Sequence, residues 1–116
     1  MEFNVQVVNY DPHLIDRATE FGIFAASEQA LKDCNYFCKQ DTSALINSSL
    51  IHSDTRHGVL RWVTPYAAFQ YTFPNTRHDI NPNACPGWAQ HAAEVHKATW
   101  CRVLGAAMNN YMGGSP

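Results

Sequence analysis

The chain has 116 residues and a mass of 13.0 kDa, which is enough for one hydrophobic core and too little for two. Hydrophobic residues make up 46% and charged residues 16%, so we expect a folded chain rather than a disordered one. The formal net charge is −2, with ten acidic residues against eight Lys and Arg, and this balance argues against tight binding of nucleic acid.

The sequence shows no sign of export or of a membrane span. It lacks the basic start, apolar centre and small-residue cleavage site of a signal peptide, and no apolar run approaches the ~18 residues of a span. We therefore expect folding in the cytoplasm, no membrane partner, and reduced thiols in all four cysteines. We predict a single domain over residues 1–112, followed by a frayed tail over residues 113–116.

The first elements in the sequence are a predicted strand and a predicted long helix. Residues 3–7 alternate between apolar and polar side chains, which is the period of a half-buried strand. Asp11 can cap a helix whose first position is Pro12, where a missing N–H costs nothing. Apolar residues then recur at helical spacing, so we predict a helix from Pro12 to about Cys38.

The centre of the chain predicts a turn and an antiparallel hairpin. The polar run 40–43 ends the long helix, and a short helical turn over residues 44–46 can follow it. Two β-prone runs, residues 50–53 and residues 59–63, surround a loop that closes on Gly58. Such a pair of runs is typical of a β-hairpin.

The C-terminal half predicts one helical turn, a long loop and a second long helix. Pro65 is placed to begin a single turn that ends near Gln70. Residues 73–86 contain three prolines and three asparagines without apolar periodicity, which predicts a loop. Apolar residues recur at three- and four-residue steps from Trp88 to about Ala107, which predicts a helix.

These elements predict an α+β fold. Two long helices would pack on one face of a small antiparallel sheet that contains the central hairpin. The other face and the edges of that sheet would remain free, and free edges are commonly used for pairing with other subunits. Each of the three tryptophans falls on an element with apolar neighbours, so we interpret them as residues of the core or of its edge.

The histidines and cysteines raise the question of a metal site or a catalytic thiol. Cys34 and Cys38 would share one helical face, but a second paired motif of metal ligands is absent. His91 and His96 are five residues apart and would point in different directions around a helix. A Cys/His nucleophile remains open, because such partners meet in space rather than along the chain. We expect buried, inert thiols, no metal, no cofactor and no enzymatic activity.

The aromatic residues between Tyr66 and Phe73 indicate an interaction surface. Four aromatic side chains fall within eight residues and cannot all face one core from a single helical turn. Aromatic residues left near the surface favour protein interfaces. The alternative is simple packing under the long loop.

Four sequence features follow one another in a specific order and spacing. They are a long helix leading into Lys39-Gln-Asp-Thr-Ser-Ala-Leu45 with Ser48 and Ser49 after it, a hairpin that ends in Leu60-Arg-Trp-Val-Thr-Pro-Tyr-Ala-Ala-Phe-Gln-Tyr71, the tripeptide Asn81-Pro-Asn83, and an alanine-rich helix from Trp88 to Trp100. This pattern resembles the minor capsid proteins of tailed bacteriophages, which belong to the neck, or head-to-tail connector. The chain departs from the usual family pattern at two positions, with Ser43 in place of Gly and Ala68 in place of a basic residue.

The resemblance implies a structural protein of the virion neck, made in the cytoplasm of the host bacterium. It implies a homomeric ring, hexameric or dodecameric, between the head-closure layer and the tail, in contact with head-closure and tail-terminator proteins. DNA would pass through the lumen without specific binding. The loop at residues 73–86 is one candidate contact, and the remaining candidates at the subunit interface are Asp41, Thr42, Ser43, Tyr66, Phe69, Gln70 and Tyr71. The alternative function is a small cytoplasmic binding module or a Cys/His-dependent enzyme.

Overall fold

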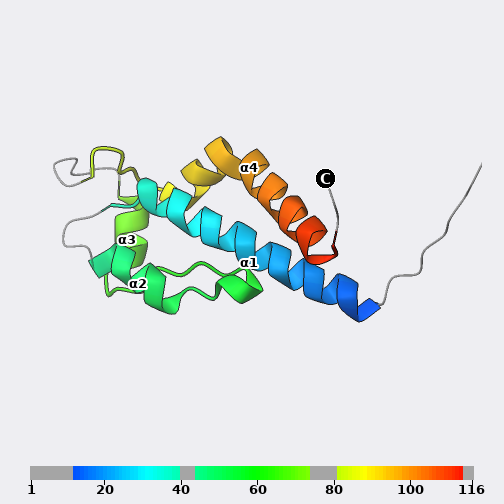
Figure 1. Ribbon diagram of the computed structural model, residues 1–116. Helices are drawn as coiled ribbons and strands as arrows, with labels where there is room; N and C mark the ends of the chain where they lie inside the picture. Colours follow the sequence, from blue (N-terminus) through cyan, green and yellow to red (C-terminus); the bar gives the residue numbers. More distant parts are fainter. Residues whose placement is uncertain (1–11, 40–43, 74–80, 114–116) are drawn as a thin grey trace, which may run out of the picture.

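The computed structural model of the chain describes residues 12–39, 44–73 and 81–113, and most of these residues are helical (Figure 1). The elements in chain order are helix α1 (Pro12–Tyr36), helix α2 (Ala44–His52), the 3-10 helix η1 (Thr55–His57), helix α3 (Ala67–Thr72) and helix α4 (Trp88–Tyr111). None of the described helices is both long and apolar enough to cross a bilayer.

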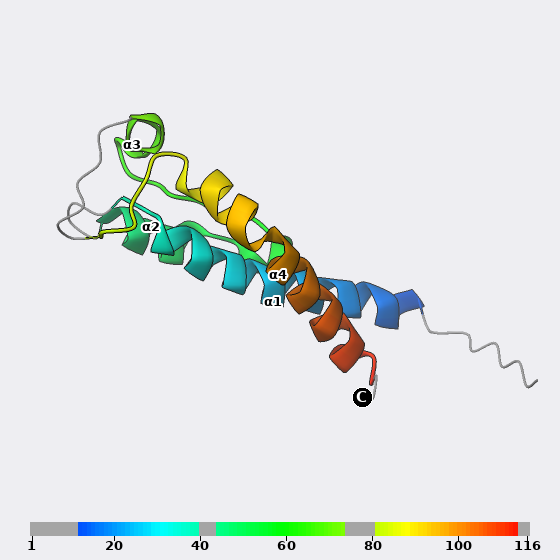
Figure 2. The same ribbon diagram turned by 90° about the horizontal axis from the view of Figure 1, so that it is seen from above.

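The two predicted long helices are confirmed. Helix α1 begins at Pro12 and ends at Tyr36, two residues before the predicted end. Helix α4 begins at Trp88 and continues to Tyr111, four residues beyond the predicted end. It runs back along α1 in the opposite direction, and the two helices cross (Figures 1 and 2). The helical turn predicted after Pro65 is also confirmed, as α3.

A glycine lets the two long helices approach closely where they cross. A Cβ atom at Gly22 would lie 2.6 Å from Cγ of Met108 and 3.0 Å from the carbonyl oxygen of Leu104. Ala18 and Ala107, which are buried, are also small residues of α1 and α4. The small side chains bring the two backbones close enough to exclude a larger residue at Gly22.

The predicted α+β fold is wrong. Residues 12–39, 44–73 and 81–113 contain no β-strand, so the small antiparallel sheet and its central hairpin are absent from them. The nearest feature is one antiparallel bridge between Asp54 and Val59, whose N–H groups each donate to the other residue's carbonyl, at 2.7 and 2.9 Å. The predicted strand at residues 3–7 and the cap at Asp11 lie outside the described residues.

The hairpin prediction failed because its first β-prone run belongs to a helix. Leu50 and Ile51 are apolar, but they lie on α2 and are 62% and 75% exposed. The face of α2 that packs inward carries Leu45, Ser48 and Ser49 instead. The predicted turn at Gly58 is present, since this residue has a φ of 72° that suits glycine.

The second β-prone run, residues 59–63, connects η1 to α3 as an open segment (Figure 1), and two of its backbone N–H groups donate hydrogen bonds to serine side chains. The backbone N–H of Val63 donates to Oγ of Ser48 at 2.9 Å, and the N–H of Arg61 donates to Oγ of Ser53 at 2.9 Å. Ser48 in turn donates its hydroxyl proton to the carbonyl of Leu45. These side chains satisfy backbone groups that a second strand would otherwise bind.

The core lies where the end of α1, helix α2 and the start of α4 meet. Its fully buried members are Cys34, Cys38, Leu45, Trp88 and Ala92. Trp62 and Trp100 are partly buried and pack against this cluster, so the interpretation of the three tryptophans as residues of the core or of its edge is confirmed.

The C-terminal part of the predicted loop, residues 81–86, has no helix and is held against the end of α1. The side-chain amide of Asn81 donates to the carbonyls of Tyr36 and Cys38, at 3.0 and 2.8 Å. The N–H of Cys85 donates to the carbonyl of Phe37 at 3.0 Å. These bonds satisfy carbonyl groups at and just beyond the C-terminal end of α1, which lack helical partners.

Candidate functional site

Helix α3 has one side that anchors it to the core. The ring of Tyr71 packs edge-on against Trp88, with ring centres 4.7 Å apart. The Tyr71 hydroxyl accepts a hydrogen bond from the N–H of Gln90 at 3.3 Å, and its carbonyl accepts one from Gly87 at 2.7 Å. Tyr71 therefore attaches α3 to the beginning of α4.

The opposite side of α3 is aromatic and exposed. Tyr66, Phe69 and Phe73 are 72%, 59% and 38% exposed, and we call these three residues the aromatic ridge. They follow one another at steps of three and four residues, so they share one face. Phe69 and Phe73 stack with ring centres 4.7 Å apart. The sequence of α3 contains no charged residue, and exposed apolar patches of this kind commonly mark interaction sites.

A hollow of about 320 Å³ lies beneath α3. Its lining residues are Trp62, Ala67, Ala68, Tyr71, Thr72 and Trp88. Nε1 of Trp88 is buried without a hydrogen-bond acceptor among the described residues, whereas Nε1 of Trp62 donates to Asn35 at 2.9 Å. A buried donor without an acceptor costs free energy, so the indole N–H of Trp88 is an unsatisfied hydrogen-bond donor beside this hollow.

The structure places the predicted interface residues differently from one another. Tyr66 and Phe69 are on the exposed ridge, Gln70 is half-buried, and Tyr71 packs on the core. Asp41, Thr42 and Ser43 lie outside the described residues. The geometry therefore gathers two of the seven candidates on one exposed face.

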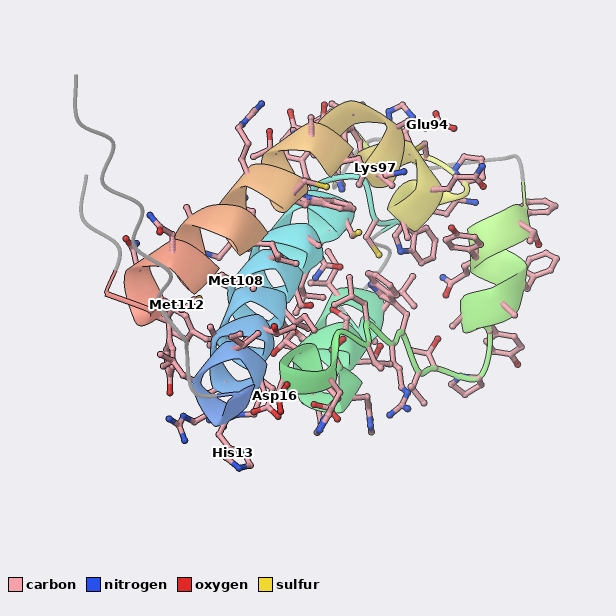
Figure 3. The ribbon with its side chains drawn as sticks, turned by 90° about the vertical axis from the view of Figure 1, so that its right-hand side faces the viewer. His13, Asp16, Glu94, Lys97, Met108 and Met112 are labelled. Atoms are coloured by element: carbon pink, nitrogen blue, oxygen red, sulfur yellow. The ribbon has the colours of Figure 1, made fainter. Side chains whose placement is uncertain are left out.

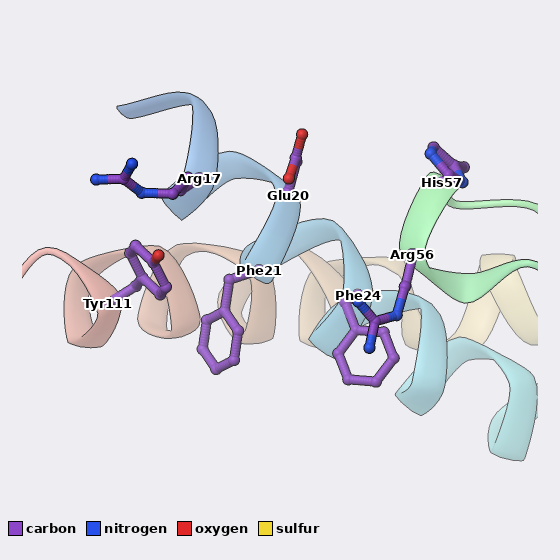
Figure 4. Close-up of a pocket in the computed structure, with 7 residues that line it drawn as sticks. All are labelled: Arg17, Glu20, Phe21, Phe24, Arg56, His57 and Tyr111. Carbon is purple, nitrogen blue, oxygen red and sulfur yellow. The ribbon is translucent and has the colours of Figure 1, made fainter. Parts of the chain in front are cut away.

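Sequence reasoning missed a second surface, a groove of about 510 Å³ at the other end of the molecule (Figure 4). We call it the arginine groove. Its main lining residues come from α1, η1 and α4, and they are Arg17, Glu20, Phe21, Phe24, Arg56 and Tyr111. Because these elements are far apart in the chain, no local pattern could have indicated the groove.

The arginine groove combines an aromatic floor with cationic groups. The rings of Phe21 and Tyr111 lie 5.5 Å apart, and the guanidinium of Arg56 lies 5.7 Å from the ring centre of Phe24. On the rim, His57 binds Asp54 at 2.7 Å, and this contact lowers the pKa of the Asp54 carboxyl. Since this is the only ion pair within the described ranges, Arg17 and Arg56 have no carboxylate partner there.

The buried thiols are poorly suited to nucleophilic chemistry. Burial raises the pKa of Cys34 to about 11, and the nearby charge of Asp33 adds to the effect. Burial and the neighbouring Cys34 raise the pKa of Cys38 to about 12. Burial also raises the pKa of Cys85, partly offset by Lys39. The thiolate is the nucleophilic form, so the raised pKa values favour the less reactive protonated form of these three thiols at neutral pH.

The described histidines, cysteines and acids do not assemble into a metal centre. No group of three or more such side chains lies close enough to hold an ion within the described part of the chain. Cys34 and Cys38 are buried in the apolar core, and His91 and His96 both lie beside the ring of Phe37. A structural zinc site built on the paired cysteines thus has too few ligands among these residues.

Comparison of the chain with models of protein families, with curated proteins and with solved structures found no match.

Proposed function

We propose that the chain is a structural component of a tailed-phage virion, a neck protein that forms a homomeric ring between the head-closure layer and the tail. The sequence pattern described above motivates this proposal. The observation that carries it is the aromatic ridge, because Tyr66 and Phe69 lie within the run from Leu60 to Tyr71, one of the features on which the resemblance rests. A monomer that leaves such a surface in water is suited to bind a neighbouring subunit.

The rest of the molecule is consistent with this role. In the proposal, the ring is a hexamer or a dodecamer that contacts head-closure and tail-terminator proteins, and DNA passes through it without specific binding. The net charge of −2 suits a channel that must let a polyanion slide. The raised pKa values of Cys34, Cys38 and Cys85 give the alternative of a Cys/His-dependent enzyme little support.

The test is incorporation into virions. A phage lacking its own copy of the gene would be complemented with the wild-type chain, and purified particles would be examined by mass spectrometry and by immunogold electron microscopy of the neck. We expect the chain at the neck of complete particles. Its absence from particles that carry head and tail would reject the proposed function.

A pair of variants tests the aromatic ridge. The variant Tyr66→Ser/Phe69→Ser should reduce incorporation at least about tenfold, the factor that corresponds to about 1.4 kcal/mol of lost contact energy. The matched control is Leu50→Ser/Ile51→Ser, which removes two equally exposed apolar residues from α2. Circular dichroism would verify that both variants fold. Equal incorporation of the two variants would exclude the ridge as the assembly contact.

A further inference from the structure

The arginine groove has the properties of a docking site for a charged surface. Arg17 and Arg56 have no carboxylate partner among the described residues, and Arg56 is held in place by the ring of Phe24. Glu20 is an exposed acid beside them, and Phe21 and Tyr111 are 43% and 40% exposed. A matching surface must therefore offer an acid, a base and small apolar groups.

Such a surface is present on this chain, on the outer face of α4. Glu94, Lys97 and Ala98 are exposed there, and Val95 is 56% exposed. Glu94 is three residues from Lys97 and four from Ala98, so these three residues share one side of the helix, and Val95 lies at the edge of that side. We call the four residues the α4 face. Figure 3 shows Glu94 and Lys97 at the end of α4 that is far from Met108 and Met112.

We propose that the arginine groove binds the α4 face of a second copy of the chain. Glu94 of one copy would meet Arg56 of the next, and Lys97 would meet Glu20, with Arg17 at the far end of the groove (Figure 4). Val95 and Ala98 would cover the aromatic floor, and a groove of about 510 Å³ has room for these side chains. The charges are complementary at each contact, which gives the pairing both orientation and specificity.

A second copy suits the groove better than nucleic acid does. Glu20 would repel a phosphate backbone, and three aromatic side chains offer no compensation for burying phosphate charge. A helix face with one acid and one base can pair with Arg56 and Glu20, and its two aliphatic residues can cover the aromatic floor.

The two surfaces make the contact heterologous. Glu94 and Tyr111 are 17 residues apart on α4, which corresponds to roughly 26 Å along the helix axis. Because the groove and the α4 face are different parts of the molecule, each copy keeps one of them free after binding a neighbour. Heterologous contacts build rings or open filaments rather than closed dimers. The inference rests on the proposed function, since it names surfaces that would join the copies of the proposed ring.

The experiment uses two charge-reversed variants of the full chain. The groove variant is Arg17→Glu/Arg56→Glu, and the face variant is Glu94→Lys. Each variant alone opposes like charges at the contact, whereas a mixture of the two allows both the original pairing and the reversed one. Sedimentation equilibrium would measure association of the wild type, of each variant and of the mixture, at concentrations into the millimolar range.

We expect the wild type to associate, each variant to associate at least about tenfold more weakly, and the mixture to recover the wild-type affinity within about threefold. The matched control is Lys32→Glu/Arg61→Glu, at two exposed positions outside the groove. It changes the net charge by the same amount as the groove variant and should associate like the wild type. Circular dichroism would establish that all variants fold.

Three results would overturn the inference: a monomeric wild type throughout this range, unchanged association of the folded variants, or a mixture that does not recover. A double-stranded oligonucleotide that binds the wild type and not the groove variant would instead assign the groove to nucleic acid. Incorporation into virions is measured separately, so a negative result in sedimentation equilibrium would not reject the proposed function. Conversely, if the chain were absent from virions, the pairing of the two surfaces could still be measured in solution.

Discussion

The indole N–H of Trp100 donates a hydrogen bond to a carboxylate oxygen of Asp33 at 2.7 Å, and this bond joins α4 to α1. The other carboxylate oxygen of Asp33 accepts a bond from the side-chain amide of Gln29 at 3.2 Å. A carboxylate near the C-terminal end of a helix opposes the helix dipole. The two hydrogen bonds offset that cost, because bonds to charged acceptors are stronger than neutral ones.

Loss of the bond between Trp100 and Asp33 should destabilise the fold. We expect Trp100→Phe to lower the free energy of unfolding by about 1.5–3 kcal/mol, the range for hydrogen bonds to charged groups. A double-mutant cycle with Asp33→Ala, measured by urea unfolding, should give a coupling energy of about 1 kcal/mol or more. As a control, Trp62→Phe should combine additively with Asp33→Ala, because Trp62 donates to Asn35 instead. Additivity of the first pair would contradict the assigned contact.

The helix crossing predicts opposite effects for two glycine substitutions. Gly22→Ala should lower the free energy of unfolding by about 1–3 kcal/mol, because its Cβ would meet Met108 and the backbone of Leu104. Gly105→Ala is the matched control on α4, where nothing lies within 4 Å of the added atom. It should stabilise the protein by about 0.5–1 kcal/mol through the better helix propensity of alanine. Thermal unfolding would compare the two, and equal effects would contradict the close approach.

Two tyrosines only five residues apart should behave differently. Tyr71→Ala should lower the free energy of unfolding by about 2 kcal/mol or more, because the side chain packs on Trp88 and its hydroxyl accepts a bond from Gln90. Tyr66→Ala should change it by about 0.5 kcal/mol or less, since Tyr66 is 72% exposed. Chemical denaturation would measure both. A large loss of stability from Tyr66→Ala would show that the ridge contributes to folding rather than to assembly.

The buried thiols predict a loss of stability at alkaline pH. The pKa values of Cys34 and Cys38 are raised to about 11 and about 12 from an ordinary value of 9.0, so the folded state favours the protonated thiols. Their contribution is complete below about pH 9 and is lost as the pH rises towards the folded pKa values. The free energy of unfolding, measured by urea unfolding between about pH 8 and about pH 11, should therefore fall more steeply with pH for the wild type than for Cys34→Ala/Cys38→Ala. Parallel curves would contradict the raised pKa values.

The sequence predicted the long helices because their apolar residues repeat over many turns. Both α1 and α4 were found with errors of a few residues at their ends. The hairpin prediction failed at Leu50 and Ile51, where β-prone residues face solvent on a helix. The nine residues of α2 are too few to show whether their apolar residues repeat with the period of a helix or with that of a strand.

The candidate surfaces were predictable only where they are local. The exposed aromatics of residues 66–73 could be inferred, because one helical turn cannot bury four rings on a single side. The division between the exposed Tyr66 and the packed Tyr71 depends on Trp88, which is 17 residues further along the chain than Tyr71. The arginine groove could not be predicted from the sequence, because Arg17, Arg56 and Tyr111 are far apart in the chain and are brought together only by the packing of α1, η1 and α4.

The serine contacts to residues 59–63 make this segment sensitive to side-chain identity. In a sheet, a neighbouring strand supplies backbone acceptors whatever residues it carries. Here the acceptors are the hydroxyls of Ser48 and Ser53, so removal of a single oxygen atom by mutation to alanine deletes the partner of a backbone N–H. Evolution could vary the exposed Leu50 with little effect on this segment, whereas Ser48 and Ser53 would tolerate few replacements.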